Sequence, residues 1–328
     1  MNKPHTPSPS RVDHDPLRPR LARVAAARRD SRRLAWQGAV LLAGAATCWW
    51  ADQAHAGDRL PATWGVTQVE GAAGGGLTPW AVISGTGASD QAGGSVAVTE
   101  VKTKDHRLRV ASAAVGIRDR VELSMARWSF KVSEDVIPGG KSLEMSVLGA
   151  KVKVAGNAVY DQDTWLPQIS VGAQYKRADD VDFLKVVGLP IRADEDVELY
   201  IAATKLWLGA LAGYNVLGNV TVRWTRANQF DLLGFGSETE PDHHLKVEGS
   251  LGVMLRDDLV LGGEFRSKPD NFGSVPGLST FKEDDAYDVF LAWFPQRNVS
   301  LTAAWVDLGN IATKKNQRGW YLSGQLTF

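Results

Sequence analysis

The chain ends in Trp320-Tyr-Leu-Ser-Gly-Gln-Leu-Thr-Phe328, and this stretch decides the fold that we expect. Counted back in twos from the last residue, one face of an extended chain carries four apolar residues and a glycine: Trp320, Leu322, Gly324, Leu326 and Phe328. The residues between them are mostly polar: Tyr321, Ser323, Gln325 and Thr327. A period of two residues predicts a β-strand with one apolar and one polar face.

This strand resembles the closing strand of bacterial outer-membrane β-barrels, in which the barrel assembly machinery reads a terminal aromatic residue. We therefore assign the five residues of its apolar face as an assembly signal. The pattern departs from the usual one because Ser323, with Gly324 beside it, stands where a glycine is expected. A strand that covers a soluble β-sandwich core would show the same alternation, so the front of the chain is an independent test.

The front of the chain carries the features of an export signal. An arginine-rich stretch at residues 28–33 precedes an apolar run at residues 34–50. This run is shorter than the roughly 20 apolar residues that span a bilayer. Ala54-His-Ala56 then has the small-x-small pattern of a cleavage site. We expect cleavage between Ala56 and Gly57 and localisation of the mature protein in the outer membrane.

Composition narrows the range of partners. The chain has 37 Lys and Arg against 37 Asp and Glu, and much of the positive charge lies in the leader, so the mature protein is acidic. Nucleic acid is therefore not an expected partner. The single cysteine, Cys48, lies in the signal and excludes a disulfide framework. The partners that we expect are outer-membrane lipid, the barrel assembly machinery, periplasmic chaperones and a small solute of unknown identity.

From residue 95 onward, the sequence alternates in segments of about ten residues separated by turn signals, as in transmembrane β-barrels. We expect an all-β, antiparallel, up-and-down transmembrane barrel. Its twelve strands are predicted at residues 95–103, 107–117, 120–131, 142–155, 167–177, 196–206, 218–228, 244–255, 259–267, 285–294, 299–307 and 318–328.

Three parts of the chain follow from this assignment. Residues 1–56 form the export signal with a long basic leader, residues 57–94 a glycine-rich segment, and residues 95–328 the barrel. The glycine-rich segment is either a plug or a first hairpin of the wall. Both ends of the wall must lie on the same side of the membrane, so a hairpin would raise the strand number to fourteen. We favour twelve.

Connections and aromatic residues give two further expectations. Short and long connections alternate, although residues 156–166 and 207–217 are long for periplasmic turns. Five predicted strands contain a segment that starts with an aliphatic residue, alternates and reaches an aromatic residue 4 to 7 positions on, and we expect these aromatic residues in the girdle at the membrane interface. These aromatic residues are Trp128, Tyr175, Trp224, Phe265 and Trp305.

Three stretches resemble a proteobacterial family known only as domain of unknown function 3034. They are Val69-Glu-Gly-Ala-Ala-Gly-Gly-Gly-Leu-Thr-Pro-Trp80, Arg120-Val-Glu-Leu-Ser-Met-Ala-Arg127 and Val159-Tyr-Asp-Gln-Asp-Thr-Trp-Leu-Pro-Gln168. The resemblance runs through the whole predicted mature chain. It implies an outer-membrane barrel and implies nothing about a substrate.

We find no pattern that predicts catalysis, a metal or a cofactor. The three histidines after the signal, His106, His243 and His244, fall at strand ends or in loops. Neighbouring side chains of an extended chain point apart, so the adjacent histidines alone do not form a metal site. Asp161 and Asp163 are interpreted as a polar turn rather than a calcium loop, because the glycine and distal glutamate of such a loop are missing.

If the aliphatic residues face lipid, six acidic and six basic residues face the lumen. They are Glu122, Glu144, Lys151, Lys153, Lys176, Glu198, Arg223, Lys246, Glu248, Glu264, Arg266 and Asp288. Equal numbers of both signs argue against a strongly ion-selective pore. We interpret the protein as a passive channel or transporter for small polar solutes. The alternatives are a structural or surface-interaction barrel whose lumen is closed by paired charges and, less favoured, an enzyme of the barrel rim.

Overall fold

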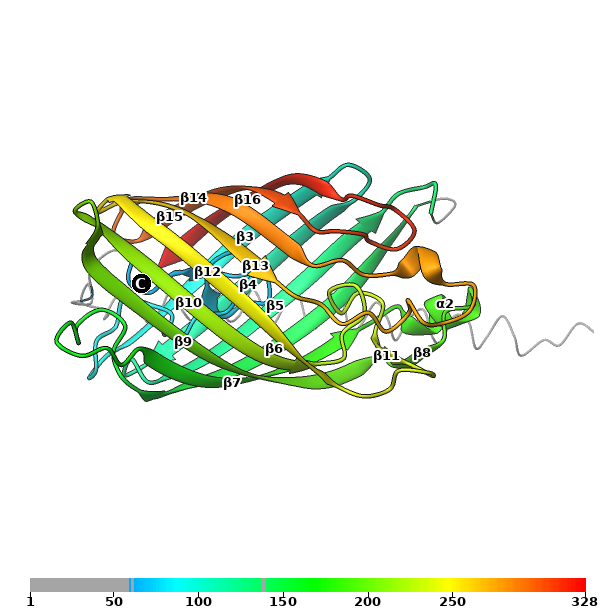
Figure 1. Cartoon of the computed structure of the whole chain (residues 1–328), viewed down its shortest axis with the longest axis horizontal. Coiled ribbons are helices and arrows are strands. Elements are labelled where there is room, and N and C mark those ends of the chain that lie inside the picture. Colours follow the sequence, from blue (N-terminus) through cyan, green and yellow to red (C-terminus); the bar gives the residue numbers. More distant parts are fainter. Residues whose placement is uncertain (1–58, 60–61, 137–139) are drawn as a thin grey trace, which may run out of the picture. The chain divides into compact units, whose positions relative to one another are not determined.

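The computed structural model describes residues 59, 62–136 and 140–328, so the predicted export signal with Ala54 and Ala56 lies outside the described residues. Twelve antiparallel strands close into one barrel in the order β10-β12-β13-β14-β15-β16-β3-β4-β5-β6-β7-β9 (Figure 1). The last strand, β16 (Arg318–Thr327), pairs with the first, β3 (Ala92–Thr103), so the wall has no open edge. The expected fold and the strand number of twelve are confirmed.

The wall strands lie close to the predicted segments. Besides β3 and β16 they are β4 (Arg107–Ile117), β5 (Val121–Val132), β6 (Lys141–Ala155), β7 (Gln168–Ala178), β9 (Glu195–Leu211), β10 (Tyr214–Thr225), β12 (His244–Arg256), β13 (Leu259–Arg266), β14 (Ala286–Gln296) and β15 (Val299–Asp307). Outside the wall lie β1 (Val66–Thr67), β2 (Ala73–Gly74), β8 (Ile191–Ala193), β11 (Phe235–Ser237), α2 (Val181–Val186) and the 3₁₀ helix η1 (Ser279–Phe281). No helix among the described residues combines the length and the apolar character needed to cross a membrane.

The two ends of the barrel differ in their connections. At one end, called here the short-turn end, β9 and β10 are joined by Ala212 and Gly213, whose φ angles of 49° and 88° suit a tight hairpin turn. The strands thus extend into residues 207–217, and the long connection predicted there is wrong. At the other end, the long-loop end, α2, β8 and β11 lie in the connections (Figure 1). Short turns of outer-membrane barrels face the periplasm.

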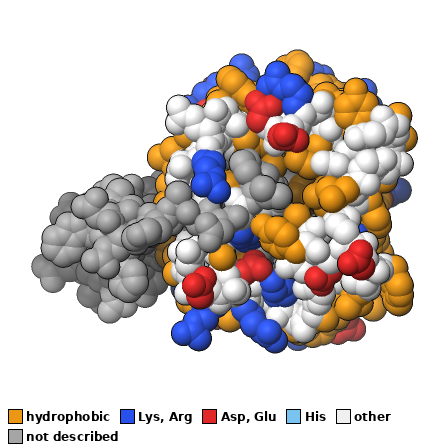
Figure 2. Space-filling model, turned by 90° about the vertical axis from the view of Figure 1, so that its left-hand side faces the viewer, with side chains coloured by type: hydrophobic (Ala, Val, Ile, Leu, Met, Phe, Trp, Pro, Cys, Tyr) orange, Lys and Arg blue, Asp and Glu red, His pale blue; other side chains and the backbone are white. Residues whose placement is uncertain are grey.

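Along the wall strands, outward-facing apolar residues alternate with inward-facing residues. Leu251 on β12 is 59% exposed, whereas its neighbour Ser250 is 7% exposed and faces the lumen. Large apolar side chains are likewise exposed on every wall strand, and hydrophobic side chains are visible along much of the rim when the barrel is viewed from the short-turn end (Figure 2). A closed barrel with an apolar outer face satisfies its backbone internally and presents hydrocarbon to lipid.

Four of the five aromatic residues predicted for the girdle lie on the outer face. Trp128 does not, because it is only 1% exposed and donates from Nε1 to the carbonyl oxygen of Val69 at 2.7 Å. Glu122 and Trp128 are separated by an even number of residues on β5, so they share one face. Placing Glu122 in the lumen therefore required Trp128 to be there too, and its assignment to the girdle is wrong.

Residues 62–91, called here the plug, run inside the barrel. Their strands β1 and β2 pair with each other and with no wall strand, so the expected alternative of fourteen strands is excluded. Glycine permits the close approach: Gly71 has φ of 97°, and a Cβ atom there would lie 2.7 Å from the Met125 carbonyl oxygen. The plug begins and ends near the short-turn end, where Arg59 lies 3.2 Å from Asp119 and donates to the Ile83 carbonyl oxygen.

The alternation on β12 generates a prediction about depth. Leu251 lies near the middle of the strand and Leu255, 39% exposed, lies near its end at the short turns. We expect Leu251→Arg to lower the free energy of unfolding in lipid vesicles by about 2–4 kcal/mol and Leu255→Arg by about 0–1 kcal/mol. Urea titrations monitored by heat-dependent gel mobility measure both. Equal losses would contradict the placement of Leu251 in the membrane core. Ser250 is no neutral control, because its hydroxyl bonds the plug.

Candidate functional site: the closed lumen

The plug is held by side chains of the wall that bond its backbone. Glu264 on β13 accepts from the amides of Gly76 and Leu77, the latter at 2.6 Å. Its other oxygen accepts from the hydroxyls of Thr78 at 2.6 Å and Ser250 at 2.7 Å. A buried segment without regular structure must satisfy its amides in this way. Glu264 therefore fixes residues 76–78 of the plug to the wall.

A second contact joins the plug to an ion pair of β5 and β6. Glu122 and Lys151 lie directly opposite each other, 3.0 Å apart, and each is 1% exposed. Glu122 accepts from the amides of Ala73 at 3.1 Å and Ser84 at 2.8 Å. Lys151 donates to the carbonyl oxygens of Ala73 at 3.1 Å and Trp80 at 3.0 Å. The pair thus bonds both the inward and the returning half of the plug.

A group of seven ionisable residues, called here the charge cluster, lies deeper in the lumen. Its members are Glu70, Lys176, Glu198, Arg223, Asp231, Glu248 and Arg266, all with side chains no more than 4% exposed. Glu70 belongs to the plug and Asp231 to a connection at the long-loop end, whereas the other five belong to wall strands. Charges buried this deeply require partners, because desolvation of each ion costs several kcal/mol.

Glu70 is the plug's contribution to the cluster. Its carboxylate contacts Lys176 at 2.8 Å, Arg266 at 2.7 Å and Arg223 at 3.0 Å. These three basic residues hold the pKa of Glu70 well below its usual value in spite of the opposing effect of burial. Glu70 is therefore ionised and tied to β7, β10 and β13 together.

Lys176 stands where three carboxylates meet. Its Nζ lies 2.8 Å from Glu70, 2.6 Å from Glu198 and 2.7 Å from Asp231. The ligand oxygens of these acids lie within 4.8 Å of one another, a spacing that suits a metal ion. An ammonium group has three donors, and here the three acids surround it. The Lys176 Nζ atom thereby joins the plug, the wall and the connection that carries Asp231.

The connection that carries Asp231 is strained. Residues 226–237, called here the inner loop, include three successive non-glycine residues with left-handed φ angles: Gln229 at 52°, Phe230 at 55° and Asp231 at 69°. Each such residue costs about 1–2 kcal/mol. Glu283 holds the loop by accepting from the Gln229 amide at 2.5 Å. Burial raises the pKa of Glu283 to about 7, although Lys268 lies 3.4 Å away.

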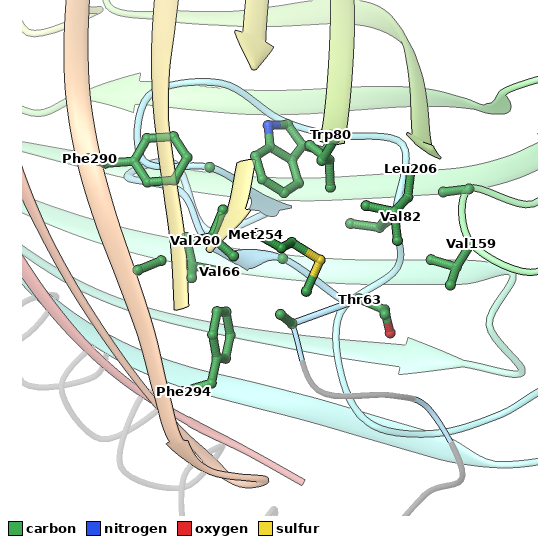
Figure 3. Close-up of a pocket in the computed structure, with 16 residues that line it drawn as sticks. Thr63, Val66, Trp80, Val82, Val159, Leu206, Met254, Val260, Phe290 and Phe294 are labelled. Carbon is green, nitrogen blue, oxygen red and sulfur yellow. The ribbon is translucent and has the colours of Figure 1, made fainter. Parts of the chain in front are cut away.

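Apolar layers lie on both sides of these polar contacts. Toward the short-turn end, a cavity of about 30 Å³ lies between Val66, Trp80 and Val82 of the plug and apolar side chains of the wall. Figure 3 shows Met254, Val260, Phe290 and Phe294 among the side chains around it. Toward the long-loop end, a second cavity of about 30 Å³ is lined mainly by apolar residues. Neither cavity is a hydrated pore.

The residues predicted to line the lumen are mostly found there. Eleven of the twelve lie on the inward face of their strands, although Lys153 and Lys246 are partly exposed near its two ends. Glu144 faces outward and pairs with Arg127 at 2.6 Å, so its assignment to the lumen is corrected. The reason is parity: Glu144 and Lys151 are seven residues apart on β6 and cannot share a face.

His243, His244 and the aspartate turn lie apart from this site, whereas His106 lines the second cavity. His243 stacks on Trp224 with ring centroids 3.9 Å apart, and its Nε2 lies 2.8 Å from Asp196. His244 begins β12, and His106 is a buried residue of the β3–β4 connection. Asp161 and Asp163 are exposed in the connection between β6 and β7.

The five residues of the predicted assembly signal lie on β16 or just after it. Trp320, Leu322 and Leu326 are 64%, 58% and 55% exposed on the outer face, and Gly324 lies between them. Phe328 bonds Gly94 through both its amide, at 2.9 Å, and its carbonyl oxygen, at 2.7 Å. Its ring also lies against Gly94.

The register of β12 and β13 generates a prediction about coupling. Glu248 and Arg266 face each other, but Arg266 lies 3.5 Å from Glu248, whereas Arg223 lies 2.6 Å from it. We expect the double-mutant cycle of Glu248→Gln with Arg223→Gln to give a coupling energy of about 1–3 kcal/mol. The cycle of Glu248→Gln with Arg266→Gln should give less, because Glu70 is the nearest partner of Arg266. Equal coupling in urea titrations would refute this ranking.

Comparison with known proteins places this barrel in a family. No curated protein matches the sequence. The structure resembles a KdgM porin with a TM-score of 0.44 and 10% identity, over 71% of this chain and 99% of that one. It resembles a NanC porin with a TM-score of 0.44 and 9% identity, over 72% and 98% of the two chains. It resembles Omp33, an outer membrane protein of Acinetobacter baumannii, with a TM-score of 0.42 and 9% identity, over 73% of this chain and 100% of that one.

A family model matches residues 63–325, which include all but the first residue of the plug and all twelve wall strands except the last two residues of β16. This chain, an outer-membrane β-barrel, belongs to the family described as protein of unknown function DUF3034.

Proposed function

We propose that this protein is a gated conduit for small polar solutes, closed in the described state by its own plug. The observation that carries the proposal is the way in which the plug is seated. Glu264, the Glu122–Lys151 pair and the charge cluster bond it through polar contacts. Such contacts can be exchanged for water when the plug withdraws, and the wall would then be lined by charges of both signs.

The wall itself favours a gate over a permanently filled barrel. A buried ion pair gives little net stability, and well-packed apolar residues of similar volume often stabilise as much or more. A lumen that never admits water would gain little net stability from the ions of β7, β9, β10, β12 and β13 compared with apolar residues of similar volume. A lumen that is hydrated in one of its states needs them. The closed-lumen structural barrel is the second candidate, favoured by the depth at which the cluster is buried.

The outward face of β16 supports a separate proposal about assembly. We propose that Trp320, Leu322, Gly324, Leu326 and Phe328 present the signal that the barrel assembly machinery reads, after periplasmic chaperones have delivered the chain. Three of these side chains are strongly exposed on the face that contacts lipid. We propose no enzymatic activity for this barrel.

Single-channel conductance in planar bilayers tests the gate. The parent protein should remain closed at neutral pH, with brief openings. Trp80 packs at the first cavity and donates to Ser250 at 2.8 Å, so Trp80→Ala should loosen the plug. We expect Trp80→Ala to raise the open fraction at least about tenfold, since a buried Trp→Ala change costs about 3–5 kcal/mol. Trp80→Ala should also speed sugar uptake by reconstituted vesicles.

A disulfide across the plug is the matched control. The hydroxyls of Thr78 and Ser250 are 2.6 Å apart, which places cysteines at these positions within bonding reach. Oxidised Thr78→Cys/Ser250→Cys should stay closed, and reduction should restore the openings; the Thr78→Cys variant alone should not respond to oxidation. A steady current through the oxidised protein would disprove closure by the plug. If neither Trp80→Ala nor the reduced Thr78→Cys/Ser250→Cys variant conducts current, the structural barrel would be favoured.

A further inference from the structure

The charge cluster contains one acid too many. Its acids are Glu70, Glu198, Asp231 and Glu248, and its bases are Lys176, Arg223 and Arg266. Without the plug, the wall and the inner loop contribute three acids and three bases. Insertion of Glu70 therefore adds an uncompensated negative charge to a region shielded from water. Buried groups in this situation bind a proton rather than remain unpaired ions.

Asp231 is the member of the cluster with the fewest partners. Its Oδ2 contacts Lys176 at 2.7 Å, but its buried Oδ1 has no hydrogen-bond partner among the described residues. Glu70, by contrast, contacts all three bases. Burial, together with the charges of Glu198 and Glu70, raises the pKa of Asp231 to about 8, against the opposing effects of Lys176 and Arg266.

Other elements packed around the inner loop also carry ionisable groups. Arg223 on β10, Arg266 on β13 and Glu248 on β12 complete the cluster near Asp231. Lys268 lies 4.4 Å from the ring centroid of Phe230, and Glu283 bonds the Gln229 amide. Glu283 titrates near pH 7 and is the alternative source of a pH response in this loop.

We propose that the inner loop is a proton-linked gate over the plug: it closes by taking up one proton on Asp231 and opens by releasing it. The left-handed residues 229–231 show that the loop is held inward against its own backbone preference. The contacts of Asp231 with Lys176 reach the same ammonium group that binds Glu70. Opening of the loop and release of the plug are therefore linked. This inference rests on the proposed gate.

The direction of the pH effect follows from proton linkage. An aspartate that is exposed in an open loop has a pKa of about 3.9, whereas the closed loop holds Asp231 at about 8. Between these values the closed state binds one more proton than the open state. The opening constant should therefore rise about tenfold per pH unit up to about pH 7, by about fivefold from pH 7 to pH 8, and level off above pH 8. Closure is favoured at low pH and weakened as pH rises.

Cysteine labelling of the full chain in lipid vesicles measures this constant. Leu232, 5% exposed beside Asp231, becomes the reporter as Leu232→Cys in a Cys48→Ala background. The probe is a membrane-impermeant maleimide, and Ser274→Cys, on an exposed residue, corrects for its own pH dependence. From pH 7 to pH 8, we expect the corrected labelling rate of Leu232→Cys to rise about fivefold, because Asp231 is already half ionised in the closed loop at about pH 8.

Three variants in the reporter background assign the proton. Asp231→Asn keeps the shape of the side chain but cannot ionise, so the corrected rate should become independent of pH in this range. Glu70→Gln removes one of the charges that raise the pKa of Asp231, so the slope should become smaller. Glu283→Gln should keep the slope. The proposal is overturned if Asp231→Asn retains the slope or if Glu283→Gln abolishes it. Should Asp231→Asn fail to fold, an undiminished slope in Glu70→Gln overturns it equally.

Conductance recorded on the same samples distinguishes this inference from the proposed function. A flat labelling profile in a protein that opens as Trp80→Ala predicts would reject the proton link and keep the gate. A steady current at every pH, together with a flat profile, would reject both. A rise of about fivefold in labelling from pH 7 to pH 8 that Asp231→Asn removes would support the inference.

Discussion

The burial of Glu70 among Lys176, Arg223 and Arg266 is the interaction on which the closed lumen depends. It brings a charge of the plug into contact with β7, β10 and β13, which belong to the run of neighbouring strands β7-β9-β10-β12-β13. Removing one partner of a buried ionic group is far more costly than its presence is favourable, because the remaining charge is then uncompensated. The plug and the wall are consequently bound to one arrangement.

The apolar layers on either side strengthen this interaction. Trp80 and Phe290 near one cavity and Trp128 and Phe230 near the other keep water from the cluster. Electrostatic attraction is stronger where the local dielectric is low, and an unpaired charge is also more costly there. The same layers explain why inward-facing residues of the wall include valine and phenylalanine, which a polar pore would not need.

The sequence predicts the wall much better than its contents. Alternation on strands such as β12, where Leu251 faces out and Ser250 faces in, is imposed by lipid on one side and is visible residue by residue. With the three-residue turn 256–258, alternation predicts Leu255 opposite Leu259 and Glu248 opposite Arg266. The second pairing is confirmed, but a bulge near the turn pairs Arg256 with Leu259, so the first is wrong.

Alternation does not predict the charge cluster. Its residues are far apart in the sequence, and Glu70 and Asp231 come from segments that lack a two-residue period. Glu70 lies between Val69 and six residues rich in glycine, so its neighbours in the sequence do not predict which basic residues it contacts. Asp231 lies in a loop, where an acid is ordinarily solvated. One signal in the sequence could have indicated the cluster. An acidic residue, Glu70, stands beside a glycine-rich segment that can enter the lumen, and Lys176, Arg223 and Arg266 lie on inward faces of the predicted strands.

Closure from two directions brings both barriers to one ammonium group. The plug enters from the short-turn end and the inner loop from the long-loop end, and both contact Lys176. If the plug leaves, the wall and the inner loop keep three acids and three bases, so no charge is uncompensated. If the loop leaves first, Lys176 still retains Glu70 and Glu198, and the remaining acids and bases again balance. Withdrawal of one barrier weakens the hold on the other through Lys176 without leaving an uncompensated charge, which is what a reversible gate requires.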